Sequence, residues 1–283
     1  MHIFVTGSTG FLGSHFVCQA LSEGHKITAL RHRAIALSAI SWPEQPLWIN
    51  ASLLSLKASQ LRGVDAIAHF AATGVSPRTA TWHELEEINI RATLNLCIIA
   101  KEIGARISIA GSFAEYGLSG NKYAFIPANA PLEPTYPYAA SKAAASILTA
   151  AFARSERIQL AYLRIFNAYG EGQFKANLWP SMRSAALNGE DFPLTKGEQI
   201  RDFIDVKEVS MKFLNSLTSV QIDSGNPLIA NIGSGKPQTI HDFCSFWWNT
   251  WNAEGKLLFG RVPYREGEVM RYVPEINHPL CTP

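Results

Sequence analysis

A tyrosine and a lysine four residues apart, Tyr138 and Lys142, offer the clearest chemistry in the sequence. At this spacing both side chains lie on one face of a helix. The ammonium group is expected to lower the pKa of the phenol, so that Tyr138 can donate or accept a proton near neutral pH. Pro134 and Pro137 precede the pair, as is common where a loop ends and a helix begins. Such a pair is by itself usually an ordinary surface feature, so its meaning depends on the residues that accompany it.

Ser112 is the first of these residues, and it closely follows an apolar run, residues 106–110, that is predicted to be a buried strand. Open α/β sheets bind ligands at the carboxyl ends of their parallel strands. Ser112 is therefore expected at that edge, where its hydroxyl could hydrogen-bond the same substrate oxygen that Tyr138 protonates. Considered alone, Ser112 would be interpreted as a turn or helix-cap residue.

A glycine-rich turn at residues 6–13, Thr-Gly-Ser-Thr-Gly-Phe-Leu-Gly, follows the first predicted strand and opens a helix. In this context Gly7 permits a tight turn, Gly10 lets the backbone approach a pyrophosphate, and Gly13 allows the helix to pack closely on the strand. The free N–H groups of the helix N-terminus would face the anion. The turn therefore predicts a dinucleotide-binding site, the alternative being a purely structural turn.

Two arginines near the end of the second predicted strand, Arg31 and Arg33, bear on the choice of dinucleotide. An acidic residue at this place would hydrogen-bond the adenosine ribose of NAD. The sequence here is Leu-Arg-His-Arg, and guanidinium groups attract a 2′-phosphate. NADP(H) is thus expected in preference to NAD, unless both arginines are solvated surface residues.

The elements that must position these residues alternate along the first two thirds of the chain. Short apolar runs predict buried parallel strands at residues 3–6, 26–30, 66–70, 106–110 and 159–164, and helical spacing predicts helices at 12–21, 84–103 and 141–153. This order predicts an α/β fold, a Rossmann-type doubly wound parallel sheet. We expect a dinucleotide-binding domain at residues 1–165. A smaller C-terminal substrate-binding lobe is expected at residues 166–283, with some of its segments returning to the first domain.

Composition argues against several classes of function. A formal charge of +2 in 283 residues, without a run of Lys or Arg, gives no sign of a nucleic-acid partner. No apolar run is long enough for a membrane span or a signal peptide. The cysteines show neither metal-ligand nor disulfide spacing, and they stand at Cys18, Cys97, Cys244 and Cys281. A soluble, cytoplasmic protein without a bound metal is expected.

These segments together make the chain resemble the extended short-chain dehydrogenase/reductases, the NAD-dependent epimerase/dehydratase family of nucleotide-sugar enzymes. Besides the glycine turn, Ser112 and the Tyr138/Lys142 pair, the matching segments stand in the family's order at residues 65–72, 163–170, 201–206, 231–235 and 265–268, with Asn89 before a helix. The resemblance thus extends over nearly the whole chain.

The resemblance implies a catalytic set and a set of cofactor contacts. Tyr138 would be the acid/base on the sugar hydroxyl or carbonyl, Lys142 would hold the nicotinamide ribose and tune Tyr138, and Ser112 would assist. The cofactor contacts would come from Gly7, Thr9, Gly10, Phe11, Leu12, Arg31, Arg33, Phe70, Ala71, Ala72, Tyr138 and Lys142.

The resemblance also implies three substrate contacts. Asn167 would touch the sugar nucleotide, while Arg201 and Arg265 would neutralise its diphosphate with forked, permanent charges. For Arg201 the alternative is a structural salt bridge with Asp202 or Asp205.

Phe113 and Ala114 narrow the reaction. Dehydratases of this family place an Asp-Glu pair here to move protons during water loss, and neither residue of this chain can titrate. Epimerase-reductases resembling the nucleotide-fucose synthases place a cysteine where Ala114 stands and a histidine near Asn177, and both are missing. Two reactions remain: reduction of the C4 keto group of a nucleotide-4-keto-6-deoxyhexose, and 4-epimerisation of a nucleotide-sugar with retained NAD. Arg31 and Arg33 favour the reductase, because a reductase consumes NADPH.

A function of a different class, a non-catalytic dinucleotide-sensing protein, also fits the fold. The complete set of Ser112, Tyr138 and Lys142 argues against it, because a sensor needs no tuned phenol. The family also suggests a homodimer that pairs through the predicted helix around residues 84–100.

Several positions depart from the family's pattern or leave their role open. Residues 50–52 are Asn-Ala-Ser where an aspartate usually meets the adenine, the tail after Met270 lacks the usual helical ending, and Glu115 replaces an apolar residue. Glu115 is interpreted equally well as a substrate contact or as a solvated charge. A group of aromatic residues at helical spacing is expected to pack the second lobe rather than stack on a base, namely Phe243, Phe246, Trp247, Trp248 and Trp251.

Overall fold

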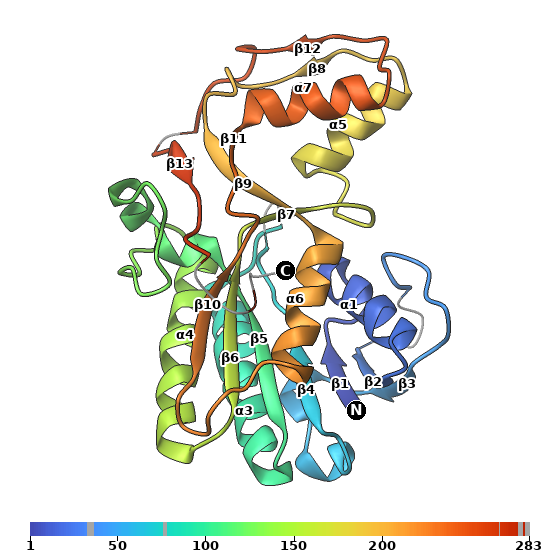
Figure 1. The fold of residues 1–283 in the computed structure, drawn as a ribbon, viewed down its shortest axis with the longest axis vertical. Helices are drawn as coiled ribbons and strands as arrows, with labels where there is room; N and C mark the ends of the chain where they lie inside the picture. Colours follow the sequence, from blue (N-terminus) through green and yellow to red (C-terminus); the bar gives the residue numbers. More distant parts are fainter. Residues whose placement is uncertain (33–36, 76–77, 266, 277–279, 281–283) are drawn as a thin grey trace.

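Seven parallel strands form the centre of the larger part of the molecule, the body, in the order β10-β6-β5-β4-β1-β2-β3 (Figure 1). This computed structural model describes the whole chain except residues 33–36, 76–77, 266, 277–279 and 281–283. The strands are β1 (His2–Thr6), β2 (Lys26–Arg31), β3 (Leu47–Asn50), β4 (Ala66–His69), β5 (Arg106–Ser112), β6 (Leu160–Ile165) and β10 (Leu228–Ile232). The direction of winding reverses between β1 and β4, which is where doubly wound sheets bind ligands. The predicted Rossmann-type α/β fold is confirmed.

Helices cover both faces of this sheet, and alternate residues of each strand point to opposite faces. Ile3 and Val5 pack in one apolar core with α1 and α6, whereas Phe4 packs in the other with α3 and α4. Burial on both faces explains why the strands read as continuous apolar runs. The α-helices are α1 (Phe11–Ser22), α2 (Trp82–Leu85), α3 (Ala92–Ile103), α4 (Pro137–Glu156), α5 (Leu178–Leu187), α6 (Val206–Thr218) and α7 (Ile240–Thr250).

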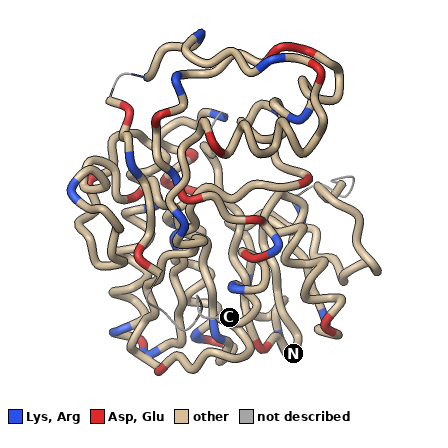
Figure 2. The backbone as a smooth tube through the Cα atoms, turned by 45° about the horizontal axis from the view of Figure 1, so that its top comes forward, with Lys and Arg blue, Asp and Glu red and all other residues tan. Residues whose placement is uncertain are grey.

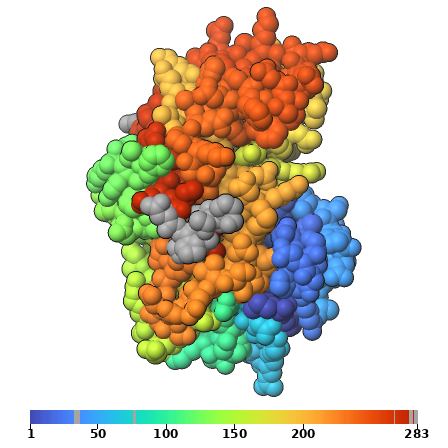
Figure 3. Space-filling model, viewed as in Figure 1, coloured from blue at the N-terminus to red at the C-terminus, as the bar shows by residue number. Residues whose placement is uncertain are grey.

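A smaller lobe stands on the carboxyl edge of the sheet, and Figure 3 shows it in yellow to red above the body. In its four-stranded sheet β9 pairs with β7, β11 and β13. The strands of the lobe are β7 (Asn167–Tyr169), β8 (Phe192–Pro193), β9 (Ile200–Asp205), β11 (Pro237–Thr239), β12 (Leu257–Leu258) and β13 (Arg271–Tyr272). Phe243 and Trp248 of α7 are buried in the lobe as predicted, but Phe246 is 59% exposed.

The chain passes between body and lobe four times: after β6, between β9 and α6, between β10 and β11, and after β13. Strand β10, which the sequence pattern did not predict, returns to pair with β6. In its described residues, the tail after Met270 contains no helix. Instead β13 pairs with β9, and Leu280 packs into the core that contains α1 and α6.

The predicted helix at residues 84–103 is composite, whereas the periodic segment 141–153 and the Tyr138/Lys142 pair lie on one continuous helix. The first consists of α2, a π-helical segment η3 (Glu86–Arg91) and α3. The second, α4, begins at Pro137, so that Tyr138 and Lys142 are both helical. In the described part of the chain no helix is long and apolar enough to cross a membrane. Figure 2 shows Lys and Arg interspersed with Asp and Glu over the backbone.

Candidate active site

Two adjoining cavities lie at the carboxyl edge of the large sheet, below the lobe. One of about 360 Å³ is bordered by the turn after β1, the segment after β4 and the loop after β7. The other, of about 460 Å³, is bordered by Ser112, Tyr138 and residues of the lobe. The two cavities form one cleft because they share the lining residues Phe11, Leu12, Val75, Gln173 and Asn177.

The glycine-rich turn is shaped by two close approaches of backbone. Gly7 has a φ of +66°, and a Cβ there would lie 2.6 Å from the backbone nitrogen of Ala71. A Cβ on Gly13 would lie 2.2 Å from the carbonyl oxygen of Gly7. The helix α1 begins after Gly10, whose lack of a side chain leaves the first N–H groups uncovered. The turn therefore fits a dinucleotide pyrophosphate, which needs close backbone approach and the positive end of a helix.

Apart from Tyr138 and Lys142, the predicted cofactor contacts divide into three groups. Ala71 adjoins Gly7, and its N–H donates to Thr6 Oγ1 at 3.3 Å. Arg31 lies apart from the lining of both cavities, and Arg33 lies outside the described residues. The contacts that line the 360 Å³ cavity are Gly7, Thr9, Gly10, Phe11, Leu12, Phe70 and Ala72.

Ser112 and Tyr138 line the same cavity, whereas Lys142 lies behind them. Ser112 ends β5, and its hydroxyl accepts a hydrogen bond from the N–H of Ala114 at 3.2 Å. Lys142 follows Tyr138 by one turn of α4 and is only 2% exposed. The lysine ammonium therefore sits in a dry environment next to the cleft.

The pKa of Tyr138 is raised, whereas the spacing of Tyr138 and Lys142 predicted that it would be lowered. Burial raises the pKa of the Tyr138 phenol, the charge of Glu115 and Tyr136 raise it further, and a hydrogen bond with Ser112 acts against them. Burial also lowers the pKa of the Lys142 ammonium to about 8, with the carboxylate of Glu115 opposing this. Tyr138 is therefore a neutral proton donor at pH 7.

The three predicted substrate contacts line the same cavity as Tyr138. The side-chain amide of Asn167 donates to the carbonyl oxygen of Asp202 at 2.9 Å. Arg201 forms its salt bridge with Glu268, at 2.7 Å, and not with the acidic residues expected from the sequence. Arg265 is exposed at the cavity wall. Two cations thus border the part of the cleft formed by the lobe.

The carboxylate of Asp202 does not pair with Arg201 and is hydrogen-bonded elsewhere. It accepts hydrogen bonds from the backbone nitrogens of Ser234 and Lys236, at 2.7 and 3.1 Å, and from the Ser234 hydroxyl at 3.0 Å. These bonds join β9 to the segment between β10 and β11.

Several residues that border the cleft carried no recognisable signal in the sequence. Arg78 lines the smaller cavity with its guanidinium 4.6 Å above the ring of Phe174. Within the described residues, Gln173 Oε1 and Trp179 Nε1 are buried in the larger cavity's wall without a hydrogen-bond partner. None of these residues belongs to a motif from which a place at the cleft could be predicted.

Comparison with known proteins places most of the chain in one family model. Residues 3–233 match the model described as the NAD dependent epimerase/dehydratase family. A dTDP-6-deoxy-L-talose 4-dehydrogenase (NAD(+)) of Aggregatibacter actinomycetemcomitans is 26% identical, with 85% of this chain and 87% of that protein aligned. A UDP-glucose 4-epimerase of Mycoplasma pneumoniae is 28% identical, over 83% of this chain and 77% of that protein.

Solved structures give the same picture. A UDP-N-acetylglucosamine 4-epimerase of Methanobrevibacter ruminantium, in complex with UDP-N-acetylmuramic acid, superposes with a TM-score of 0.85 at 26% identity, covering 98% of this chain and 89% of that one. MoeE5 in complex with UDP-glucose and NAD superposes with a TM-score of 0.81 at 26% identity, covering 98% and 90%.

Proposed function

Because the chain belongs to the NAD dependent epimerase/dehydratase family, we propose that it is a nucleotide-sugar oxidoreductase that reduces the C4 keto group of a nucleotide-4-keto-6-deoxyhexose. One observation carries the proposal. Ser112 and Tyr138 share a cavity with the predicted substrate contacts, and that cavity adjoins the cavity bordered by the glycine-rich turn. The cleft thus offers a proton donor between a site for a dinucleotide and two cations suited to a diphosphate.

The residues of the chain supply the proton and the orientation for this reaction. When bound, the reduced nicotinamide supplies a hydride to C4 of the sugar. Tyr138 then donates its phenolic proton to the oxygen that becomes an alkoxide, and the hydroxyl of Ser112 hydrogen-bonds the same oxygen. The ammonium of Lys142 stabilises the phenolate that remains until a proton from water restores it.

The direction of reduction is supported by the state of Tyr138. Burial and the nearby carboxylate of Glu115 favour the neutral phenol, which is the form that donates a proton to a carbonyl oxygen. Phe113, which lines the cavity directly after Ser112, brings no titratable group for water elimination. The relative from Aggregatibacter actinomycetemcomitans is named as a 4-dehydrogenase of a dTDP-6-deoxy sugar.

A nucleotide-sugar 4-epimerase is the second candidate function. It is favoured by the similarity to two 4-epimerases, including the solved structure with the TM-score of 0.85. An epimerase begins by removing a proton from the C4 hydroxyl, so it needs Tyr138 as a phenolate. Retained NAD and a phenol ionised near neutral pH would favour this candidate.

The two candidates are separated by one assay of the purified protein. With NADPH or NADH and a nucleotide-4-keto-6-deoxyhexose, we expect coenzyme oxidation and the 6-deoxyhexose nucleotide in equal amounts. Interconversion of C4 epimers of a nucleotide-hexose without added coenzyme, and no oxidation in the first assay, would establish the epimerase instead. Turnover in neither assay would support the dinucleotide-sensing alternative.

We further propose NADP(H) as the preferred coenzyme, on the basis of Arg31 at the end of β2. Its Nε donates to Asn50 Oδ1 at 2.7 Å, and its guanidinium lies 4.3 Å above the ring of Trp48. The two terminal nitrogens make no hydrogen bond within the described residues. The contacts with Asn50 and Trp48 therefore orient the guanidinium and leave these two nitrogens available to a 2′-phosphate.

Replacing Arg31 by Ala is expected to weaken NADPH binding by about ten-fold or more and to leave NADH binding within about two-fold, because only NADPH carries the 2′-phosphate. Fluorescence titration with each coenzyme measures both constants. Arg62→Ala, an exposed arginine outside both cavities, is the matched control. Equal losses for the two coenzymes would assign Arg31 a purely structural part.

We also propose a homodimer formed through α3 and α4. These neighbouring helices expose apolar side chains, with Ile98, Ile147 and Leu148 at 38%, 64% and 38% exposure. Light scattering of the purified protein measures the mass, and a monomer at micromolar concentration would rule this pairing out.

A further inference from the structure

A buried ion pair lies directly behind the proposed catalytic residues. Nε of Arg164, in β6, donates to Oε2 of Glu115 at 2.7 Å, and the two side chains are 4% and 0% exposed. Glu115 belongs to the short 3₁₀ helix η4 (Phe113–Tyr116) that follows Ser112. It is therefore neither the solvated charge nor the substrate contact that the sequence allowed. Two buried charges add little stability compared with apolar side chains of similar size, so their position next to the catalytic residues calls for another explanation.

The carboxylate of Glu115 connects the two elements that carry the catalytic residues. Its Oε1 accepts a hydrogen bond from the backbone N–H of Ser112 at 2.7 Å. The same oxygen lies 3.0 Å from the hydroxyl of Tyr162, which is also 2.9 Å from the carbonyl oxygen of Lys142. Glu115 thereby links the backbone of β5 to α4.

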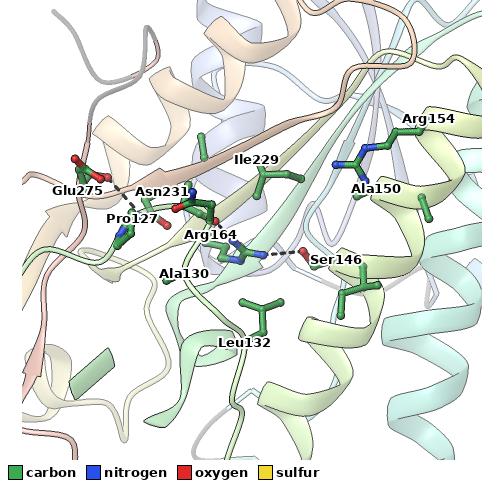
Figure 4. Close-up of a pocket in the computed structure, with 15 residues that line it drawn as sticks. Pro127, Ala130, Leu132, Ser146, Ala150, Arg154, Arg164, Ile229, Asn231 and Glu275 are labelled. Carbon is green, nitrogen blue, oxygen red and sulfur yellow. Dashed lines mark hydrogen bonds between the residues drawn. The ribbon is translucent and has the colours of Figure 1, made fainter. Parts of the chain in front are cut away.

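The guanidinium of Arg164 makes a second connection to α4. Its Nη2 donates to Ser146 Oγ at 2.9 Å, one turn beyond Lys142, as the dashed line in Figure 4 shows. Its Nη1 donates to the carbonyl oxygen of Ala128 at 2.8 Å and to the hydroxyl of Tyr116 at 3.2 Å. Arg164 also borders a cavity of about 650 Å³ between α4 and β10.

We propose that Glu115 and Arg164 are positioning residues, which fix the distance between Ser112 and α4 and set the negative charge that faces Lys142. The inference rests on the proposed function, since it assumes that Ser112, Tyr138 and Lys142 act together.

The charges around Lys142 give this inference a testable signature. Lys142 is faced by Glu115 of η4 and His69 of β4 and follows Tyr138 by one turn of α4, while Tyr162 of β6 adjoins Glu115. Burial lowers the pKa of His69 to about 3, and the pKa values of both tyrosines are raised, so all three are neutral at pH 7. Within the described residues Glu115 is thus the anion that keeps Lys142 protonated. Its charge also raises the pKa of Tyr138.

Replacing Glu115 by Gln keeps the shape of the side chain and removes its charge. We expect kcat to fall by about 10- to 100-fold, because small displacements of reacting groups have effects of this size, while KM stays within about three-fold. The alkaline limb of the kcat profile should move to lower pH, since both Lys142 and Tyr138 then lose their protons more easily. NMR titration of the Lys142 Cε resonance should show its pKa lowered by the same change.

The matched control is Glu133→Gln, which removes the carboxylate of an exposed ion pair with Lys122. It should change neither the pH profile nor the Lys142 titration. A Glu115→Gln variant that melts at a lower temperature but keeps the wild-type kcat, alkaline limb and Lys142 pKa would overturn the inference and leave the pair a structural role.

Two further variants test the pair if Glu115→Gln does not fold. Tyr162→Phe removes only the hydroxyl between Glu115 and the Lys142 carbonyl, and should lower kcat without changing coenzyme affinity. Arg164→Ala opens a space toward the 650 Å³ cavity, so added guanidinium should restore part of the lost kcat. Wild-type kcat in Tyr162→Phe, or no rescue of Arg164→Ala by guanidinium, would contradict the proposed linkage.

Failure of this inference can be distinguished from failure of the proposed function. If the wild-type protein turns over no nucleotide sugar, the proposed function fails, but the Lys142 titration in wild type and Glu115→Gln still decides whether the charge of Glu115 reaches Lys142. If the wild type is active and the variants match it, only the inference about the ion pair fails.

Discussion

Replacing Tyr138 by Phe is expected to lower kcat by about a thousand-fold, because general acid catalysis by a positioned side chain contributes roughly 10²- to 10⁴-fold. Binding of the coenzyme and of the nucleotide sugar should stay within about three-fold, since the phenyl ring keeps its place in the cavity wall. Stopped-flow or steady-state kinetics measures kcat, and fluorescence titration measures coenzyme binding.

Tyr264→Phe is the matched control for this experiment. The hydroxyl of Tyr264 donates to Glu198 Oε2 at 2.8 Å, away from the lining of the cleft. Turnover should therefore be unchanged. Wild-type turnover in Tyr138→Phe would remove Tyr138 from the reaction and with it the proposed mechanism.

The same mechanism predicts a pH profile for the wild-type enzyme. The raised pKa of Tyr138 keeps its phenol protonated through neutral pH. The ammonium of Lys142, whose pKa is lowered to about 8, loses its proton as the pH rises above that value. The rate of reduction should accordingly be flat near pH 7 and decline above about pH 8.

Replacing Gly13 by Ala is expected to abolish measurable dinucleotide binding and to lower the free energy of unfolding by about 1–3 kcal/mol, as overpacking does. The new Cβ would lie 2.2 Å from the carbonyl oxygen of Gly7 and 2.8 Å from its carbonyl carbon. Both are backbone atoms, so α1 must move away from the turn. Coenzyme titration and urea unfolding measure the two effects.

Gly24→Ala provides the control at the other end of α1. A Cβ there meets nothing within 4 Å, but the φ of +78° is unfavourable for alanine. It should destabilise the fold by about 1–2 kcal/mol through backbone strain alone and leave coenzyme binding intact. If Gly13→Ala bound the coenzyme as tightly as Gly24→Ala does, coenzyme binding would not depend on the close packing of Gly13 against Gly7.

Features that depend on local sequence could be predicted. The turn at Gly7 and Gly13, the strand before Ser112 and the helix of Tyr138 each follow from apolar periodicity and a few neighbouring residues. Their meeting in one cleft follows from the parallel sheet, because the carboxyl ends of its strands share an edge. The start of α4 at Pro137 agrees with the expectation that Tyr138 and Lys142 share a helix that follows a proline-containing loop.

Features that depend on distant partners could not be predicted. Arg201 pairs with Glu268, which lies 67 residues away, and Glu115 pairs with Arg164 across 49 residues. The raised pKa of Tyr138 could not be predicted for the same reason. Burial and the charge of Glu115 dominate it, and neither can be read from the spacing of Tyr138 and Lys142.

The four crossings of the chain between body and lobe limit how the specificity of this enzyme can be redesigned. Asp202 of β9 hydrogen-bonds to two of the connecting segments, through Asn167 after β6 and through Ser234 and Lys236 between β10 and β11. A lobe grafted from a relative would therefore require two separate inserts with matched junctions, and its own counterpart of Asp202. Exchange of a single contiguous segment would leave the transplanted half of the lobe without the hydrogen bonds that Asp202 makes.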